Sequence, residues 1–145
     1  MKSPVRWGRV IAAAVLSEFG AITVLMAVTL VDFFLFAHNR TLAEFEQLGA
    51  RTGYYVAPVA TALATYLSAL WATRRLDAHF VVNGTLVGVG AVILTAGFLF
   101  GARPEDRLMY SVTFVLRIAA GYLGGLTAQA RFNRSRTLSS SAAGY

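Results

Sequence analysis

Four long apolar runs, separated by short charged segments, constrain this chain of 145 residues more than any other feature of its sequence. A helix needs about 20 mostly apolar residues to cross a bilayer, and the runs at 10–37, 53–73, 80–101 and 108–130 meet that length. They are continuous and lack the two-residue alternation of barrel strands. Inside lipid, the backbone hydrogen bonds of such a segment must be made within the segment. We therefore predict an all-α integral membrane protein, a bundle of four transmembrane helices.

Composition and charge exclude other classes of protein. Hydrophobic residues make up 57% of the chain and charged residues 14%, whereas a soluble domain has about 25% charged residues. A soluble globular domain and a disordered chain are both excluded. The net charge is +6, but the basic residues lie between apolar runs and form no stripe interleaved with aromatic residues. The predicted partner is the lipid bilayer with its anionic headgroups, and no nucleic acid.

The basic residues also predict the orientation of the chain. Eight of them precede the first run, follow the second or follow the fourth, whereas four lie in the loops on the other side. The positive-inside rule then places both termini in the cytoplasm. The first run is longer than the roughly 7–15 apolar residues of a signal-peptide core, so we predict an uncleaved anchor.

A capping-box pattern, Thr41-x-x-Glu44, lies in the first external loop. In such a box, two side chains satisfy backbone N–H groups at the start of a helix. Apolar residues follow at helical spacing: Leu42, Phe45 and Leu48. We predict a short interfacial helix from Thr41 to Gly49, lying along the outer surface of the membrane; a plain loop is the alternative.

Residues 1–131 are predicted to form a single four-helix transmembrane domain. The remaining segment, 132–145, is rich in Ser, Ala and Gly. Such a composition cannot bury enough apolar surface to fold. We therefore predict that 132–145 is a disordered cytoplasmic tail.

Small residues indicate which helix faces pack. Helices in lipid associate where small side chains let their backbones approach. One face of the third run carries Gly84, Gly88, Ala91 and Thr95, and the fourth run carries Gly121 and Gly125. We predict a tight bundle packed through these four glycines. A homodimer, or a larger membrane-protein partner, is a compatible further use of the same faces.

Two ionisable residues interrupt the apolar runs at depth. Glu18 lies about 12 Å from the cytoplasmic edge of the first run, and Arg117 lies about 20 Å up the fourth. Such residues are costly in lipid unless they are paired or hydrated. We predict a Glu18–Arg117 ion pair, with Thr61 or Thr65 of the second run lining the same site. Asp32, a further lining candidate, lies on the face of Glu18, four turns further out.

The predicted pair has two interpretations. It can be a structural brace that fixes helix register, or Glu18 can be a proton or cation site. No metal site is expected, because His38 and His79 lie on opposite sides of the membrane. The sequence contains no nucleophile–base pair, phosphate loop or carboxylate dyad. We therefore predict neither enzyme activity nor a cofactor.

Two motifs resemble those of a known family. Residues 83–91 (NGTLVGVGA) and 118–128 (IAAGYLGGLTA), together with Trp7 and the pair Arg74-Arg75, resemble a set of small bacterial four-helix inner-membrane proteins. Members of that set carry an HGxLVG third helix and a GGxxGG fourth helix. The resemblance implies a location in the bacterial inner membrane and the four-helix architecture, and it implies no activity.

A second resemblance concerns the first run. Residues 12–23 (AAAVLSEFGAIT) resemble the first helix of the small multidrug resistance transporters, in which a membrane-embedded glutamate exchanges protons for a cationic drug. This resemblance implies that Glu18 is that carboxylate. The GxxxG faces and the lack of a catalytic constellation predict a non-enzymatic accessory or scaffold subunit that acts by helix–helix packing. The alternative is a minimal proton-coupled secondary transporter or channel that uses Glu18.

Overall fold

The computed structural model describes residues 5–36, 41–74, 76 and 78–142, and in these residues the secondary structure is entirely helical. The helices are α1 (Trp7–Phe36), α2 (Leu42–Thr73), α3 (Phe80–Gly101), the 3-10 turn η1 (Pro104–Asp106) and α4 (Arg107–Ala142). Four of them are long and apolar enough to cross a membrane. The chain is therefore a four-helix bundle of the multi-pass membrane type, as its sequence predicts, and α3 has the predicted bounds 80–101.

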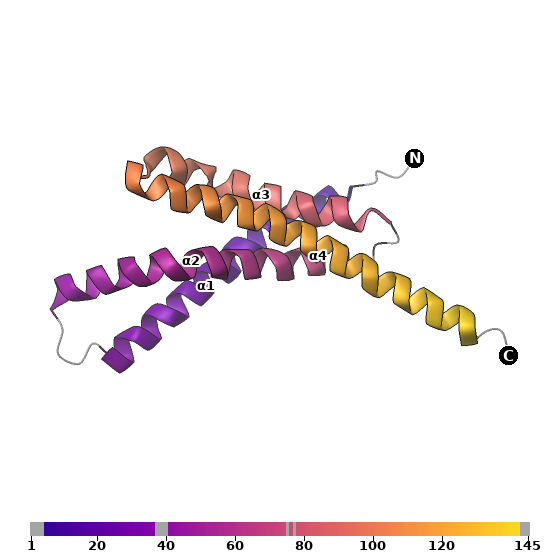
Figure 1. Cartoon of the computed structure of the whole chain (residues 1–145), viewed down its shortest axis with the longest axis horizontal. Coiled ribbons are helices and arrows are strands. Elements are labelled where there is room, and N and C mark those ends of the chain that lie inside the picture. The colour runs from indigo at the N-terminus through magenta and orange to yellow at the C-terminus, as the bar shows by residue number, and fades with distance from the viewer. Residues whose placement is uncertain (1–4, 37–40, 75, 77, 143–145) are drawn as a thin grey trace.

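The helices pack as two pairs, α1 along α2 and α3 along α4, and α4 also packs along α2. The pairs lie together at one end of the bundle and diverge toward the other (Figure 1). We call the end where the pairs lie together the closed end; it holds the start of α1 and the connection from α2 to α3. The second, the open end, holds the end of α1, the start of α2 and η1. Helix α4 extends beyond the bundle at the closed end.

In this bundle, the buried apolar side chains are mostly small, and most large apolar side chains are exposed. Buried apolar positions are mostly alanines, such as Ala13, Ala69 and Ala91, each 0% exposed. Large apolar side chains face outward instead: Phe34 is 67% exposed and Phe100 is 86% exposed. This distribution suits helices surrounded by lipid, where close packing and not burial of large apolar groups holds helices together.

The backbones of α3 and α4 touch along the predicted glycines. A Cβ atom added at Gly84 would lie 2.6 Å from the carbonyl oxygen of Gly121, and one at Gly88 would lie 2.6 Å from that of Arg117. At Gly125, an added Cβ would lie 2.7 Å from the carbonyl oxygen of Phe80. Because real Cβ atoms do not approach so closely, only glycine fits at these positions. The four glycines therefore pack α3 against α4 within one chain.

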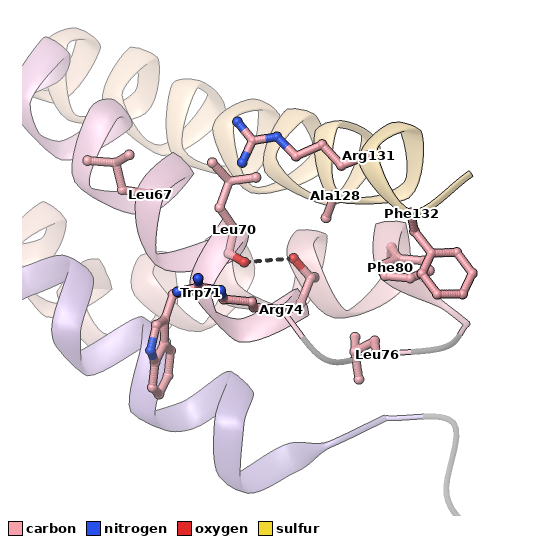
Figure 2. A pocket seen from close by; sticks show the side chains of 10 residues that line it. Leu67, Leu70, Trp71, Arg74, Leu76, Phe80, Ala128, Arg131 and Phe132 are labelled. Atoms are coloured by element: carbon pink, nitrogen blue, oxygen red, sulfur yellow. Dashed lines mark hydrogen bonds between the residues drawn. The ribbon is translucent and has the colours of Figure 1, made fainter. Parts of the chain in front are cut away.

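At the closed end, aromatic and amide side chains make contacts around the start of α3. The ring of Phe80 lies against Phe132 of α4, with ring centroids 5.2 Å apart (Figure 2). The buried amide of Asn83 accepts a hydrogen bond from the backbone N–H of Arg6 at 3.0 Å and donates one to the carbonyl of His79 at 2.9 Å. These contacts tie the N-terminal segment and α4 to α3.

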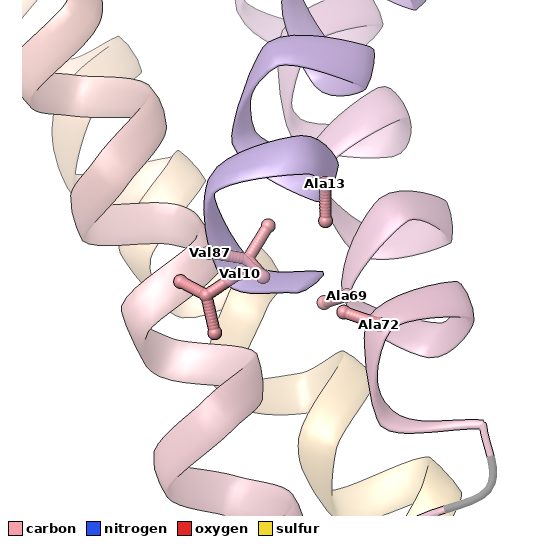
Figure 3. Close-up of a cluster of buried hydrophobic side chains, with 5 residues drawn as sticks. All are labelled: Val10, Ala13, Ala69, Ala72 and Val87. Atoms are coloured by element: carbon pink, nitrogen blue, oxygen red, sulfur yellow. The ribbon is translucent and has the colours of Figure 1, made fainter. Parts of the chain in front are cut away.

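A small apolar core lies just inside the closed end. Its members come from α1, α2 and α3 and are Val10, Ala13, Ala69, Ala72 and Val87 (Figure 3). All five side chains are short, so the three helix axes approach closely at this level. These five side chains are therefore buried where α1, α2 and α3 meet near the closed end.

The predicted short interfacial helix is wrong as a separate element. Its capping box forms, since Glu44 N donates to Thr41 Oγ1 at 3.4 Å and Thr41 N donates to a Glu44 carboxylate oxygen at 2.8 Å. The helix that starts there then runs without a break to Thr73. Extending an existing helix adds one hydrogen bond per residue, whereas a break requires two new sets of caps.

The C-terminal segment also differs from the sequence-based prediction. Helix α4 continues through Ala142, so residues 132–142 are helical where we predicted a disordered tail. The physical reason is again propagation, which costs less than nucleation once a long helix precedes the segment. The residues 143–145 of the predicted tail lie outside the described part of the chain.

Candidate functional site

Glu18 of α1 and Arg117 of α4 form an ion pair in the middle of the bundle. Nη1 of Arg117 donates to Oε1 of Glu18 at 2.5 Å, and Nη2 donates to Oε2 at 3.1 Å. The exposed fraction of the side chain is 4% for Arg117 and 20% for Glu18. The two parallel bonds match the planar guanidinium to the carboxylate, the strongest geometry for such a pair. The structure thus brings together the two charges that the sequence paired.

Helix α3 supplies the remaining contacts of the guanidinium. Nη1 of Arg117 also donates to the carbonyl of Ala91 at 3.2 Å and to Oγ1 of Thr95 at 3.0 Å. Arg117 therefore links α1, α3 and α4 through one side chain. The sequence placed a threonine of α2 near the pair and missed Thr95, although Thr95 continues the small-residue face through Gly88 and Ala91.

The two predicted threonines of α2 bond to their own helix. Thr61 Oγ1 donates to the carbonyl of Ala57 at 2.7 Å, and Thr65 Oγ1 donates to the carbonyl of Thr61 at 2.7 Å. Thr61 lines the cavity described next, and Thr65 does not. Asp32 lies outside that cavity as well, and its carboxylate accepts a hydrogen bond from Thr52 Oγ1 at 3.0 Å.

A cavity of about 440 Å³ lies between the diverging helix pairs and contacts the ion pair. Its lining comes from all four helices and η1 and is mostly apolar and aromatic: Glu18, Ala21, Ile22, Leu25, Ala50, Gly53, Tyr54, Ala57, Thr61, Thr95, Phe98, Asp106, Met109, Tyr110, Thr113, Phe114 and Arg117. Asp106 and Ala50 lie at the open end, whereas Glu18 and Arg117 lie near the middle of their helices. The cavity thus extends from the open end down to the ion pair.

One buried donor of Arg117 has no protein partner. Its Nε atom is buried and makes no hydrogen bond within the described part of the chain. An unsatisfied buried donor costs about 1–3 kcal/mol, and more when it is charged.

The charges along the cavity are unequal. Its ionisable lining consists of the carboxylates of Glu18 and Asp106 and the guanidinium of Arg117, with Tyr54 and Tyr110 as further polar groups. With the guanidinium already paired, the second carboxylate leaves an excess of negative charge. The aromatic rings present faces that attract cations. A volume of this size lies within the range of small-molecule sites, about 300–1,000 Å³.

Metal binding has no support in the described residues, in which no group of three His, Cys, Asp or Glu side chains is placed to hold a metal ion. Comparison of the chain with protein-family models, curated proteins and solved structures finds no match. What the site does must therefore be argued from its own geometry.

Proposed function

We propose that this chain is a minimal secondary transporter that exchanges protons for a small organic cation at Glu18. The observation that carries the proposal is the buried Glu18–Arg117 pair at the base of an open-ended cavity. Ionisable residues inside a membrane are expensive and mark ion or substrate paths. The resemblance of residues 12–23 to the first helix of small multidrug resistance transporters implies the same use of Glu18.

The contacts of Arg117 allow Glu18 to change partners. If a proton or a cation takes the carboxylate, the guanidinium keeps its hydrogen bonds to the carbonyl of Ala91 and to Thr95. The freed arginine is then still partly satisfied on α3, which lowers the cost of separating the pair. Proton and cation compete for one carboxylate, and this competition is the basis of exchange.

The closed end favours a transporter over a channel. The cavity extends to the open end, whereas near the other end buried side chains, among them Val10, Ala69 and Val87, pack against one another. A site that is accessible from one side at a time is what alternating access requires. By the positive-inside rule, the closed end faces the cytoplasm of a bacterial inner membrane and the cavity faces outward.

The accessory-subunit hypothesis is based on the glycine faces and on the lack of a catalytic constellation. Within this chain, Gly84, Gly88, Gly121 and Gly125 lie in the contact between α3 and α4. A homodimer or a larger partner would have to use other surfaces. We retain this hypothesis as the contrary outcome of the experiment below.

Proton release tests the proposal. Purified protein in weakly buffered detergent solution is titrated with tetraethylammonium and larger tetraalkylammonium ions while pH is recorded. A proton can be released only from molecules in which Glu18 is protonated and separated from Arg117, so the titration is repeated from neutral to acidic pH. We expect proton release that grows as the pH falls, saturates with cation and is lost in Glu18→Gln. Asp32→Asn is the matched control, because it removes a carboxylate of the same helix that lies outside the cavity, and it should release protons as the parent does.

Two results would contradict the proposal. One is equal proton release from the parent and from Glu18→Gln, because the protons would then come from another group. The other is no release or binding with any cation, together with co-purification of a second membrane protein at fixed stoichiometry. That second result would favour the accessory subunit.

A further inference from the structure

A second hollow, of about 620 Å³, lies at the closed end between the last turns of α2, the α2–α3 connection and α4. Most of its lining is apolar, and its charged residues are arginines: Leu67, Leu70, Trp71, Thr73, Arg74, Leu76, Phe80, Ala128, Arg131 and Phe132 (Figure 2). The hollow contains neither Glu18 nor Arg117. It is therefore independent of the proposed transport site.

Among the described residues that line this hollow, every charged side chain is positive. Neither Arg74 nor Arg131 forms an ion pair within the described part of the chain, and the described lining contains no acidic residue. Arg9 lies beside the end of α2 but outside the lining of the hollow, and its Nη1 donates to the backbone carbonyl of Arg74 at 2.7 Å. Its guanidinium carbon lies 5.6 Å from the ring centroid of Trp71. Two arginines that line one hollow favour binding of an anion there.

The vertical order of the lining matches a phospholipid. Trp71 and Arg74 lie at the end of α2, and tryptophan is enriched at the level of the headgroups. Leu67 lies seven residues before Arg74 on the same helix, which places it about 10 Å deeper in the membrane than Arg74. Arg74 and Arg131 are therefore at the depth of lipid phosphates, and Leu67, Leu70 and Ala128 are at the depth where acyl chains begin.

We propose that an anionic phospholipid binds in this hollow. Its phosphate group contacts Arg74 of α2 and Arg131 of α4, and one acyl chain lies along Leu67, Leu70 and Ala128. Basic pockets between transmembrane helices are known in general to hold anionic headgroups. The bound lipid connects α2 to α4 and so stabilises the closed end of the bundle.

The experiment uses the full chain in a neutral detergent. Native mass spectrometry counts bound lipid, and thermal unfolding reports stability, after addition of phosphatidylglycerol, phosphatidylcholine or inorganic phosphate. We expect phosphatidylglycerol to remain bound and to raise Tm by several degrees, and the other two additions to leave Tm unchanged. The double variant Arg74→Gln/Arg131→Gln should lose both effects. Arg103→Gln/Arg107→Gln removes the same charge at the open end and should retain them.

A further variant distinguishes a lipid bound in the hollow from general electrostatic attraction between anionic lipids and the arginines. Ala128→Phe keeps both arginines but fills the hollow, so we expect it to weaken lipid retention. Four results would overturn the proposal: retention in Arg74→Gln/Arg131→Gln, an equal loss in Arg103→Gln/Arg107→Gln, full retention in Ala128→Phe, or the same rise in Tm with inorganic phosphate alone. The last would indicate a phosphate-ion site in place of a lipid site.

Discussion

The two ends of the bundle are made from the same four helices and yet pack differently. At the closed end, short alanine and valine side chains are buried where α1, α2 and α3 meet, and the backbones of α3 and α4 touch through glycines. Toward the open end, α1 and α2 diverge from α3 and α4, and the interior holds an ion pair and a cavity. Small side chains thus allow close helix packing at the closed end, whereas an ion pair and a cavity occupy the interior toward the open end, where a solute can bind.

The largest expected effect comes from breaking the ion pair. Arg117→Leu leaves the carboxylate of Glu18 without its partner and should lower the free energy of unfolding by about 3–5 kcal/mol. Thermal unfolding and folded yield in mild detergent measure the loss. The double variant Glu18→Gln/Arg117→Leu should recover most of it, since removing both members of a buried pair is close to neutral. If the double variant is as unstable as Arg117→Leu, the pair is not what braces the bundle.

The next largest loss of stability is expected when a glycine in the contact between α3 and α4 is substituted. Gly84→Ala places a methyl group 2.6 Å from the carbonyl oxygen of Gly121, so the helices must separate, at a cost near the upper end of the usual range for overpacking, about 3 kcal/mol. Gly97→Ala is the matched control on α3, because an added Cβ at Gly97 meets nothing within 4 Å. Equal thermal stability of the two variants would mean that the close approach has no energetic weight.

The same substitution at the two ends tests their difference directly. Ala69→Leu inserts a larger side chain into the closed-end core and should cost about 1–3 kcal/mol. Ala57→Leu makes the same change in the wall of the open-end cavity, where space is available, and should cost less than about 0.5 kcal/mol. Denaturation of both variants in one detergent gives the comparison. The reverse order of stabilities would show that the open end is the tightly packed one.

The smallest effect is expected where α1 meets α2 at the open end. Thr52→Val removes the hydrogen bond to Asp32, which is 3.0 Å long and partly buried, and should cost about 0.5–1.5 kcal/mol. Thr23→Val is the control, since the exposed hydroxyl of Thr23 bonds only to a carbonyl of its own helix. A loss of Tm as large as that of Ala69→Leu would mean that the open end is braced as firmly as the closed one.

The parts of the fold that were predictable from the sequence are those with a strong physical penalty behind them. A charge in lipid must find a partner, which is why the Glu18–Arg117 pair could be predicted without a structure. Bilayer thickness sets helix length, so the bounds of α3 matched. The GxxxG patterns predicted a tight bundle packed through Gly84, Gly88, Gly121 and Gly125, and in the structure these glycines form the contact between α3 and α4.

The features that were missed depend on choices with small energy differences. Several threonines could have reached Arg117. The rotation of each helix about its own axis determines which side chain faces the guanidinium, and Thr95 bonds to it whereas Thr61 does not. A capping box shows where a helix starts and says nothing about where it stops, so Thr41 and Glu44 could not show that α2 continues to Thr73. The cavity arises from the angle between two helix pairs, and no local pattern in the sequence records that angle.

The sequence separation of the ion pair has a consequence for how the protein is made. Glu18 and Arg117 are 99 positions apart, and a ribosome adds about 5–20 residues per second. The first helix therefore waits in the membrane for about 5–20 s before its partner is synthesised. During this interval, its carboxylate lacks the guanidinium of Arg117. Arrival of the last helix thus completes assembly, and a chain that ends before α4 carries an unpaired acid in lipid, a feature by which quality control can distinguish it from the finished protein.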